Sequence, residues 1–223
     1  DLNLVLEGSS SIQIKTPEGN LASYYGIDAG KDLTITGTGS LDITADNSAI
    51  QAGALTVRDA TVSVASQNGS GMAVGSMTLE SGSVTARGLG YGIRVSDNLS
   101  VSTAAYLNAR GDKAALETGS ITIADAPYTE KADAVKVVIE DGRLTQTGVL
   151  YVNGVDILED GAELPQGVSY NGDTNTLTLQ NAAIKNHHEI REDSNANFYG
   201  IYSSEDLNLV LEGSSSIQIK TPE

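Results

Sequence analysis

The sequence predicts an all-β protein, a right-handed parallel β-helix in which short strands stack coil upon coil. Alternating apolar and polar triplets recur at a fixed step of 22 residues. Glycine (24 residues), serine and threonine are abundant, aromatic residues are only 4%, and no long window shows the 3.6-residue period of a helix. Units this short cannot bury an apolar face alone, so a continuous core forms only when they stack.

The repeat is clearest between residues 33 and 123. In each coil a first strand is followed by a second and a third, which gives three short strands per coil of about 22 residues. Each strand alternates inward apolar with outward polar side chains. The first strands centre on the triplets Leu33–Ile35, Leu55–Val57, Met77–Leu79, Leu99–Val101 and Ile121–Ile123.

Three segments are expected along the chain. Residues 1–126 form β-helix coils, 127–173 form a junction or cap between tandem repeats, and 174–223 form coils of the next domain copy. In the first coil, Leu2 or Leu4 matches Leu33. The junction carries two hairpin-like strand runs, each followed by a Glu-Asp-Gly turn. These runs are Val135–Ile139 and Val149–Ile157, and a long loop is expected at 186–199.

Residues 206–223 repeat residues 1–18 without a substitution, which gives a period of 205 residues. If residue 205 leads back into residue 1, the natural domain begins near Gly148 and continues through the copied segment. The copied segment holds three acidic residues and one basic residue, so one period has 26 acidic and 12 basic residues and a charge of −14. About seven coils per period would advance a fibre by roughly 34 Å. Copies of the chain are therefore expected to associate head to tail.

Composition excludes several classes of function. A net charge of −16 argues against nucleic acid as a partner, because phosphate binding needs clustered Lys and Arg. No stretch of eighteen apolar residues occurs, so no membrane insertion is expected. There is no cysteine, hence no disulfide and no thiolate metal site. β-Helix lyases and hydrolases need converging carboxylates with a basic partner, and that pattern is missing; Arg94 beside Glu117 is interpreted as a surface ion pair.

Five aromatic residues are the candidate site: Tyr24, Tyr25, Phe198, Tyr199 and Tyr202. The stretches ASYYGID (22–28) and ANFYGIY (196–202) match position by position, so Tyr25 should stack over Tyr199 on successive coils of a polymer. One interpretation is a repeat junction for self-association. The other is a contact for cell-surface glycans, since sugars stack on exposed aromatic rings.

No catalytic, metal or cofactor site is assigned. The adjacent His187 and His188 would point to opposite faces of a strand and chelate poorly as a pair. Calcium stays open as an alternative, because three loops are rich in oxygen ligands. Asn, Asp and Gly are also the residues that tight turns require. The loops are at 45–48, 170–175 and 192–197.

The rung DLTITGTGSLDITA followed by AIQAG, and the stretch VSYNGDTNTLTLQNAAI at 168–184, resemble a bacterial cell-surface right-handed parallel β-helix repeat family, the carbohydrate-binding-domain-like repeats of large Gram-positive secreted proteins. The resemblance implies an extracellular, wall-attached protein with an adhesive or structural duty. We expect a non-enzymatic structural repeat of a surface fibre, stalk or adhesin shaft. The alternative is a carbohydrate-binding module using the Tyr-rich loops, and the third hypothesis is a polysaccharide lyase or hydrolase.

Overall fold

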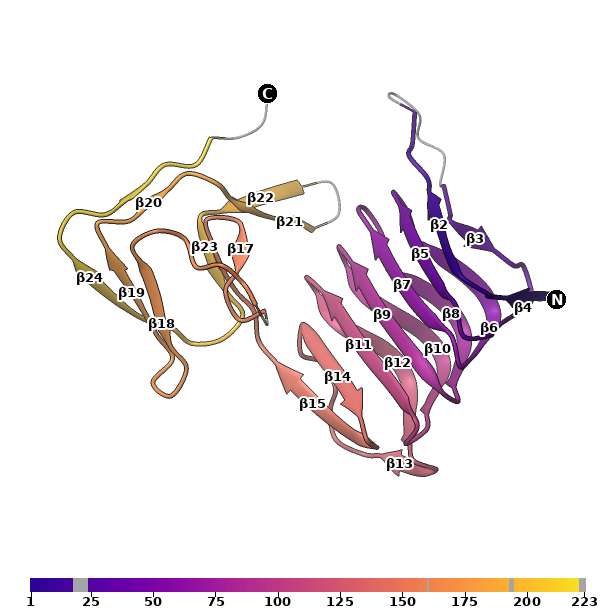
Figure 1. Ribbon diagram of the computed structural model, residues 1–223. Helices are drawn as coiled ribbons and strands as arrows, with labels where there is room; N and C mark the ends of the chain where they lie inside the picture. The colour runs from indigo at the N-terminus through magenta and orange to yellow at the C-terminus, as the bar shows by residue number, and fades with distance from the viewer. Residues whose placement is uncertain (18–23, 160, 193–194, 221–223) are drawn as a thin grey trace. The chain divides into compact units, whose positions relative to one another are not determined.

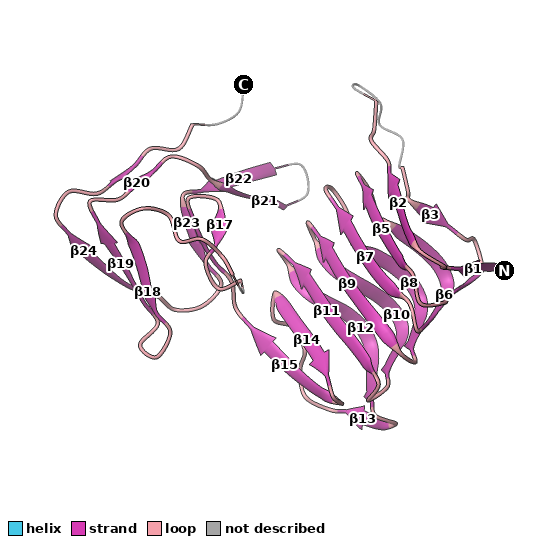
Figure 2. Cartoon of the chain, in the orientation of Figure 1, coloured by secondary structure: helices cyan, strands magenta, loops and turns pink. Residues whose placement is uncertain are grey.

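The structure is a computed structural model that describes residues 1–17, 24–159, 161–192 and 195–220. The described chain consists of strands joined by turns and loops, without a helix (Figures 1 and 2). It divides into two compact units, Asp1–Thr147 and Gly148–Glu223, each with an apolar core of its own. In this part of the chain no helix is long and apolar enough to cross a membrane.

The first unit is a parallel β-solenoid whose coils lie about 22 residues apart, which confirms the predicted fold class. Its first sheet is parallel from β1 to β12 and ends on the antiparallel β13. The strands of this sheet are β1 (Leu2–Val5), β4 (Asp32–Thr36), β6 (Ile50–Arg58), β8 (Met72–Leu79), β10 (Tyr91–Val101), β12 (Ala114–Ile123) and β13 (Ala126–Tyr128), with β3 (Ile27–Asp28) beside β6.

The second sheet of this unit is also parallel over most of its width, and the strands lie side by side in Figure 1. It ends on a hairpin, because β14 pairs antiparallel with β11 and β15 pairs antiparallel with β14. Its strands are β2 (Ser9–Gln13), β5 (Ser40–Ala45), β7 (Thr61–Ser66), β9 (Gly82–Gly88), β11 (Ala105–Gly111), β14 (Lys136–Glu140) and β15 (Arg143–Thr147).

The register between coils follows the predicted repeat. Leu2 pairs with Leu33, so the first of the two alternatives for the opening coil is the correct one. The three predicted segments of a coil are present, but the third runs on into the first segment of the next coil as one strand, as in β6. The first-segment partners are Leu33, Leu55, Met77, Leu99 and Ile121 in turn.

The core runs along the inside of the stacked coils. Leu33, Ile35, Leu55 and Val57 are each at most 1% exposed, whereas the threonine between each pair is only half-buried. Successive side chains of a strand point to opposite faces, so the inward apolar rows of neighbouring coils meet. Each coil therefore covers the next, and the strand ladders satisfy the buried backbone groups.

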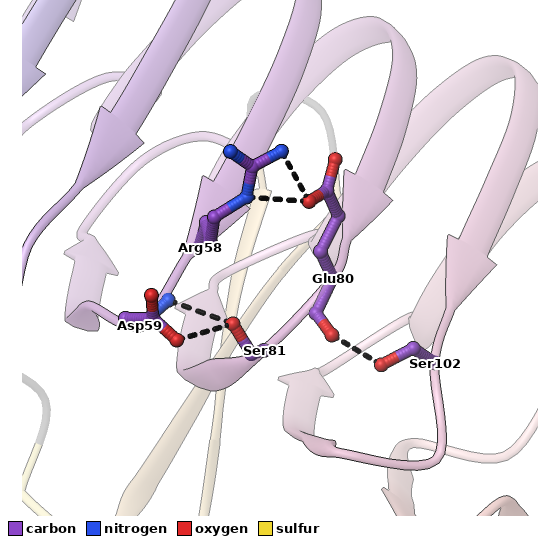
Figure 3. Close-up of polar contacts among 5 residues, drawn as sticks. All are labelled: Arg58, Asp59, Glu80, Ser81 and Ser102. Atoms are coloured by element: carbon purple, nitrogen blue, oxygen red, sulfur yellow. Dashed lines mark hydrogen bonds and ion pairs between the residues drawn. The ribbon is translucent and has the colours of Figure 1, made fainter.

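Polar contacts join the coils on the outside, at the corner that follows the first segment (Figure 3). Arg58 forms an ion pair with Glu80, 22 residues further on, with Nη2 and Oε2 2.5 Å apart. The Ser81 hydroxyl donates to Asp59 Oδ1 (2.7 Å), and the Ser102 hydroxyl donates to the Glu80 carbonyl. The corner needs a left-handed backbone, which Asp59 adopts with a φ of 62°.

The end of the first unit falls inside the predicted junction 127–173. The turn at Asp141 and Gly142, both with positive φ, joins β14 to β15 as a two-residue hairpin loop. A second hairpin with its turn at Asn153 and Gly154 opens the second unit. The division between the units lies at Thr147–Gly148, so the hairpin β14–β15 belongs to the first unit and closes its second sheet.

The second unit contains short sheets of two or three strands around a separate core. Strand β19 pairs antiparallel with β18 and parallel with β24, and β20 pairs parallel with β25. The strands are β16 (Leu150–Val152), β17 (Val155–Asp156), β18 (Val168–Asn171), β19 (Thr176–Gln180), β20 (Ala183–Ile184), β21 (His188–Glu192), β22 (Asn195–Tyr199), β23 (Ile201–Ser203), β24 (Asn208–Glu212) and β25 (Ser216–Ile217).

The prediction of a long loop at 186–199 is wrong. Residues 188–192 and 195–199 form the antiparallel hairpin β21–β22, in register from His188 opposite Tyr199 to Glu192 opposite Asn195. Ile190 is 8% exposed and helps to bury one face of this hairpin. Buried His188 and Ile190 alternate with the half-buried Glu189, which is the pattern of a strand with one face buried.

Candidate functional site

The segment that occurs twice, residues 1–18 and 206–223, is the candidate functional site and is called the shared segment below. Its first copy lies at the edge of both sheets of the first unit, with β1 against β4 and β2 against β5. The Leu6 N–H donates to the Thr36 carbonyl and the Ile14 N–H donates to the Thr44 carbonyl, each at 2.8 Å. The first copy is therefore bound to the coil that follows it in the sequence.

The second copy is bound along its opposite edge. In the second unit β24 pairs with β19 and β25 pairs with β20, both in parallel. The Asn208 N–H donates to the Asn175 carbonyl and the Gln218 N–H donates to the Ile184 carbonyl, each at 2.9 Å. The second copy is thus bound to the coil that precedes it in the sequence.

One sequence in two surroundings gives two very different exposures. Leu6 is 7% exposed in the first copy, whereas its counterpart Leu211 is 65% exposed in the second. Leu209 and Ile217, the counterparts of the half-buried Leu4 and Ile12, are about half exposed, at 50% and 52%. These side chains are in register with the buried Leu177, Leu179 and Ile184 of their own unit but are themselves exposed.

The pairings of the two copies are complementary, since they use opposite edges of one sequence. A strand in the middle of a parallel sheet pairs along both edges, and each copy shows the pairing along one of them. Along both edges the paired leucines and isoleucines of the shared segment are in register with apolar residues of the neighbouring strand. One row contains Leu177, Leu209 as the copy of Leu4, and Ile35; the other contains Ile184, Ile217 as the copy of Ile12, and Ile43.

A carboxylate holds the end of the first copy against the solenoid. The Thr16 N–H donates to Asp46 Oδ2. The backbone N–H and then the hydroxyl of Thr16 lower the pKa of Asp46 below its usual 3.8, with a smaller contribution from the charge of Lys15, while partial burial opposes the shift. The ionised form of Asp46 thus favours the docked first copy.

The five predicted aromatic residues fall into two groups. Tyr24 and Tyr25 precede β3 in the first unit, where the Asn47 N–H donates to the Tyr24 carbonyl (3.3 Å). Phe198, Tyr199 and Tyr202 lie in the second unit, and the rings of Tyr199 and Tyr202 are 5.4 Å apart. The predicted stacking of Tyr25 over Tyr199 concerns successive copies in a polymer and stays a prediction.

Three members of the aromatic cluster, Tyr151, His187 and His188, were not predicted as site residues. The ring of His188 stacks on that of Tyr151 at 3.5 Å and 5°, and both residues are buried. Phe198 packs edge-on against His187 at 4.7 Å. The strand pairing of Tyr151 with Tyr202 brings these residues together across about fifty positions of sequence. The unbroken apolar run Val149–Val152 was the available signal for a fully buried strand.

The oxygen-rich loops use their side chains in turns. Asn171 Oδ1 accepts from the Asp173 N–H (2.9 Å), and the Tyr170 hydroxyl donates to Asn175 Oδ1 (2.7 Å). Among the described residues no three His, Asp or Glu side chains gather as metal ligands, and residues 193–194 of the third predicted loop lie outside that part of the chain.

A groove with a volume of about 600 Å³ crosses β6, β8, β10 and β12 in the first unit. The third segments of successive coils line it through Gln51, Ala73, Arg94 and Glu117, which pair in this order. Arg94 forms the expected ion pair with Glu117. Both side chains are about half exposed, so the pair stabilises the fold little.

Comparisons of the chain with protein-family models, with curated proteins and with solved structures found no match.

Proposed function

We propose that this chain is a non-enzymatic structural repeat of an extracellular bacterial surface fibre, stalk or adhesin shaft, and that its copies stack head to tail. The observation that carries the proposal is the opposite pairing of the two copies of the shared segment. A tandem array contains one such segment at each repeat boundary, with β19 and β20 on one edge and β4 and β5 on the other. The boundary is then a coil like any other.

A solenoid that continues through its boundaries suits a mechanical duty. Every strand edge at a boundary finds a backbone partner, so no unpaired edge is left to aggregate. The apolar rows through Leu4, Leu6 and Ile12 become continuous, which joins the core of one period to that of the next. A charge of −14 per period keeps neighbouring fibres apart and the fibre soluble.

The decisive experiment uses a chain of two periods, in which residues 1–205 are followed directly by residues 1–223. Small-angle scattering and negative-stain electron microscopy would measure the length and the stiffness of both chains. We expect the longer chain to be a rod extended by roughly 34 Å or somewhat more for the added period. Variable angles between the second unit of the first period and the first unit of the second period would contradict the proposal, because the boundary would then act as a linker.

Glycan binding is a second candidate, and the exposure of Tyr199, a residue 37% exposed beside Tyr202, favours it. A sugar ring would lie on this face, where an aromatic side chain offers apolar surface next to polar edges. Calorimetric titration with soluble cell-wall oligosaccharides tests it. Tyr199→Ala should abolish binding, whereas Tyr106→Ala in the first unit should leave it unchanged; no binding by the parent chain would remove this candidate.

A further inference from the structure

The first copy covers the sheet edges formed by β4 and β5. The second copy carries the same side chains as the first, so it fits the same edges. Strands β4 and β5 are contacted by β1 and β2, whose sequence is identical to that of β24, β25 and the residues around them. We propose that separate chains exchange this segment: residues 206–220 of one chain displace residues 1–15 from β4 and β5 of a second copy. The proposal rests on the proposed function, since it is the way in which unlinked chains continue the solenoid.

The pairings after exchange follow from those of the first copy. Asn3 is opposite Thr34, so Asn208 of one chain lies opposite Thr34 of the second. Leu211 takes the place of Leu6 under the turn that follows β4, where Leu6 is 7% exposed. The approach there is close, because a Cβ on Gly37 would lie 2.4 Å from the Leu6 carbonyl oxygen. An identical sequence is a fully compatible replacement at such a tight site.

The exchange keeps the number of coil-to-coil contacts and frees a length of chain. Before it, the first copy is ordered on β4 and β5, and the second copy is ordered on β19 and β20. Afterwards the second copy has partners on both edges and the first copy is released. One ordered segment then makes the strand pairings that two segments made before. The conformational entropy gained by the released residues offsets the loss of entropy on association.

The observed strand pairing favours exchange over simple stacking of the second copy on the first. The apolar side chains of β24 and β25 that remain exposed, Leu209, Leu211 and Ile217, are the ones whose copies pack against the coil of β4 and β5. Stacking β24 on β1 would place the segment against itself, a pairing that neither unit shows. The occupant of the exposed face is therefore a second copy of this chain, through its β4 and β5.

Two conditions set the extent of exchange. The first copy is tethered to its own edge, so its effective concentration is in the millimolar range and separate chains compete only at high concentration. Each chain carries a net charge of −16, which opposes the approach of a second one until salt screens it. Assembly should therefore rise with both protein concentration and ionic strength.

The test uses full-length chains with introduced cysteines, since the protein has none of its own. Thr34→Cys with Asn208→Cys is the trap, because register partners lie about 4.8 Å apart and can form a disulfide. Thr56→Cys with Asn208→Cys is the matched control, one coil further in and beyond disulfide reach. On oxidation at high concentration and high salt, the trap should give a ladder of covalent multimers and the control at least tenfold less.

A third variant, Asn3→Cys with Thr34→Cys, locks the first copy on its own edge. In the oxidised state this variant should not assemble, and reduction should restore assembly, measured by light scattering on the same sample. A trap that links only within one chain, equal linkage of trap and control, or assembly unaffected by the lock would each overturn the exchange. Rod formation by the two-period chain is independent of these results, so failure of the exchange and failure of the proposed function are told apart.

Discussion

Leu6 and Leu211 allow one substitution to be compared in two surroundings of identical sequence. Leu6 is 7% exposed and Leu211 is 65% exposed. A buried Leu→Ala change costs roughly 2–5 kcal/mol, and an edge coil that can partly relax belongs near 2–3 kcal/mol. Leu211 has only about a third of its surface buried, so with about 2 kcal/mol for a fully buried leucine its replacement should cost under about 1 kcal/mol.

Hydrogen exchange followed by mass spectrometry measures the difference at the first copy. The reporting amides are those of Ile14, Gly39 and Ser40, which bond the Thr44, Leu6 and Gly8 carbonyls across the edge. A loss of 2–3 kcal/mol in local stability makes them exchange about 30- to 150-fold faster in Leu6→Ala. Dilute samples keep the chains separate. Equal effects of Leu6→Ala and Leu211→Ala, or less than a roughly threefold change in Leu6→Ala, would refute the reasoning.

Three further outcomes are expected. NMR titration should give the Asp46 carboxyl a pKa below 3.8. Its contact with Thr16 stabilises the docked first copy at pH values above 3.8, and this stabilisation is lost as the pH falls through the lowered pKa. Asp46→Asn should therefore remove this acid dependence. In a denaturant titration, Gly75→Ala should lower the free energy of unfolding by roughly 1–3 kcal/mol, because its Cβ would lie 2.4 Å from the Gly53 carbonyl oxygen. Gly90→Ala is the control: a Cβ there has open space, so the free energy of unfolding should change little. Sedimentation velocity should show more assembly at 0.5 M than at 0.05 M salt, the two conditions differing about threefold in Debye length; the opposite trend would mean that attraction between charges drives association.

The coils were predictable because one period repeats in both pattern and pairing. The step of 22 residues from Leu33 to Ile121 states which residues share a face and which lie on neighbouring coils, and the register follows it. The half-exposed ion pair between Arg94 and Glu117 followed from aligning the third segments, where these two residues lie 23 positions apart. Local alternation and a fixed period are enough when every contact is with the next coil.

The second unit was less predictable, because its contacts depend on partners that are not one period away. His188 was expected in a loop, but it is buried against Tyr151, and this depends on the pairing of β16 with β23. The two exposures of the shared segment could not be predicted from its residues at all, since Leu6 and Leu211 have the same neighbours in sequence. The exposure of a side chain in this fold depends on which coil lies against its strand, and the sequence of the strand does not determine that.

The spacing of about 22 residues between parallel pairings from β4 to β12 has a consequence for how this chain is made. Each coil needs only the coil next to it in the sequence, so the loop that must close for each contact is short and its entropic cost is nearly the same every time. A chain emerging from a ribosome or through a narrow export channel can therefore add one coil at a time to a growing template. Folding in this unit then keeps pace with emergence, and its yield does not depend on having the whole sequence free at once.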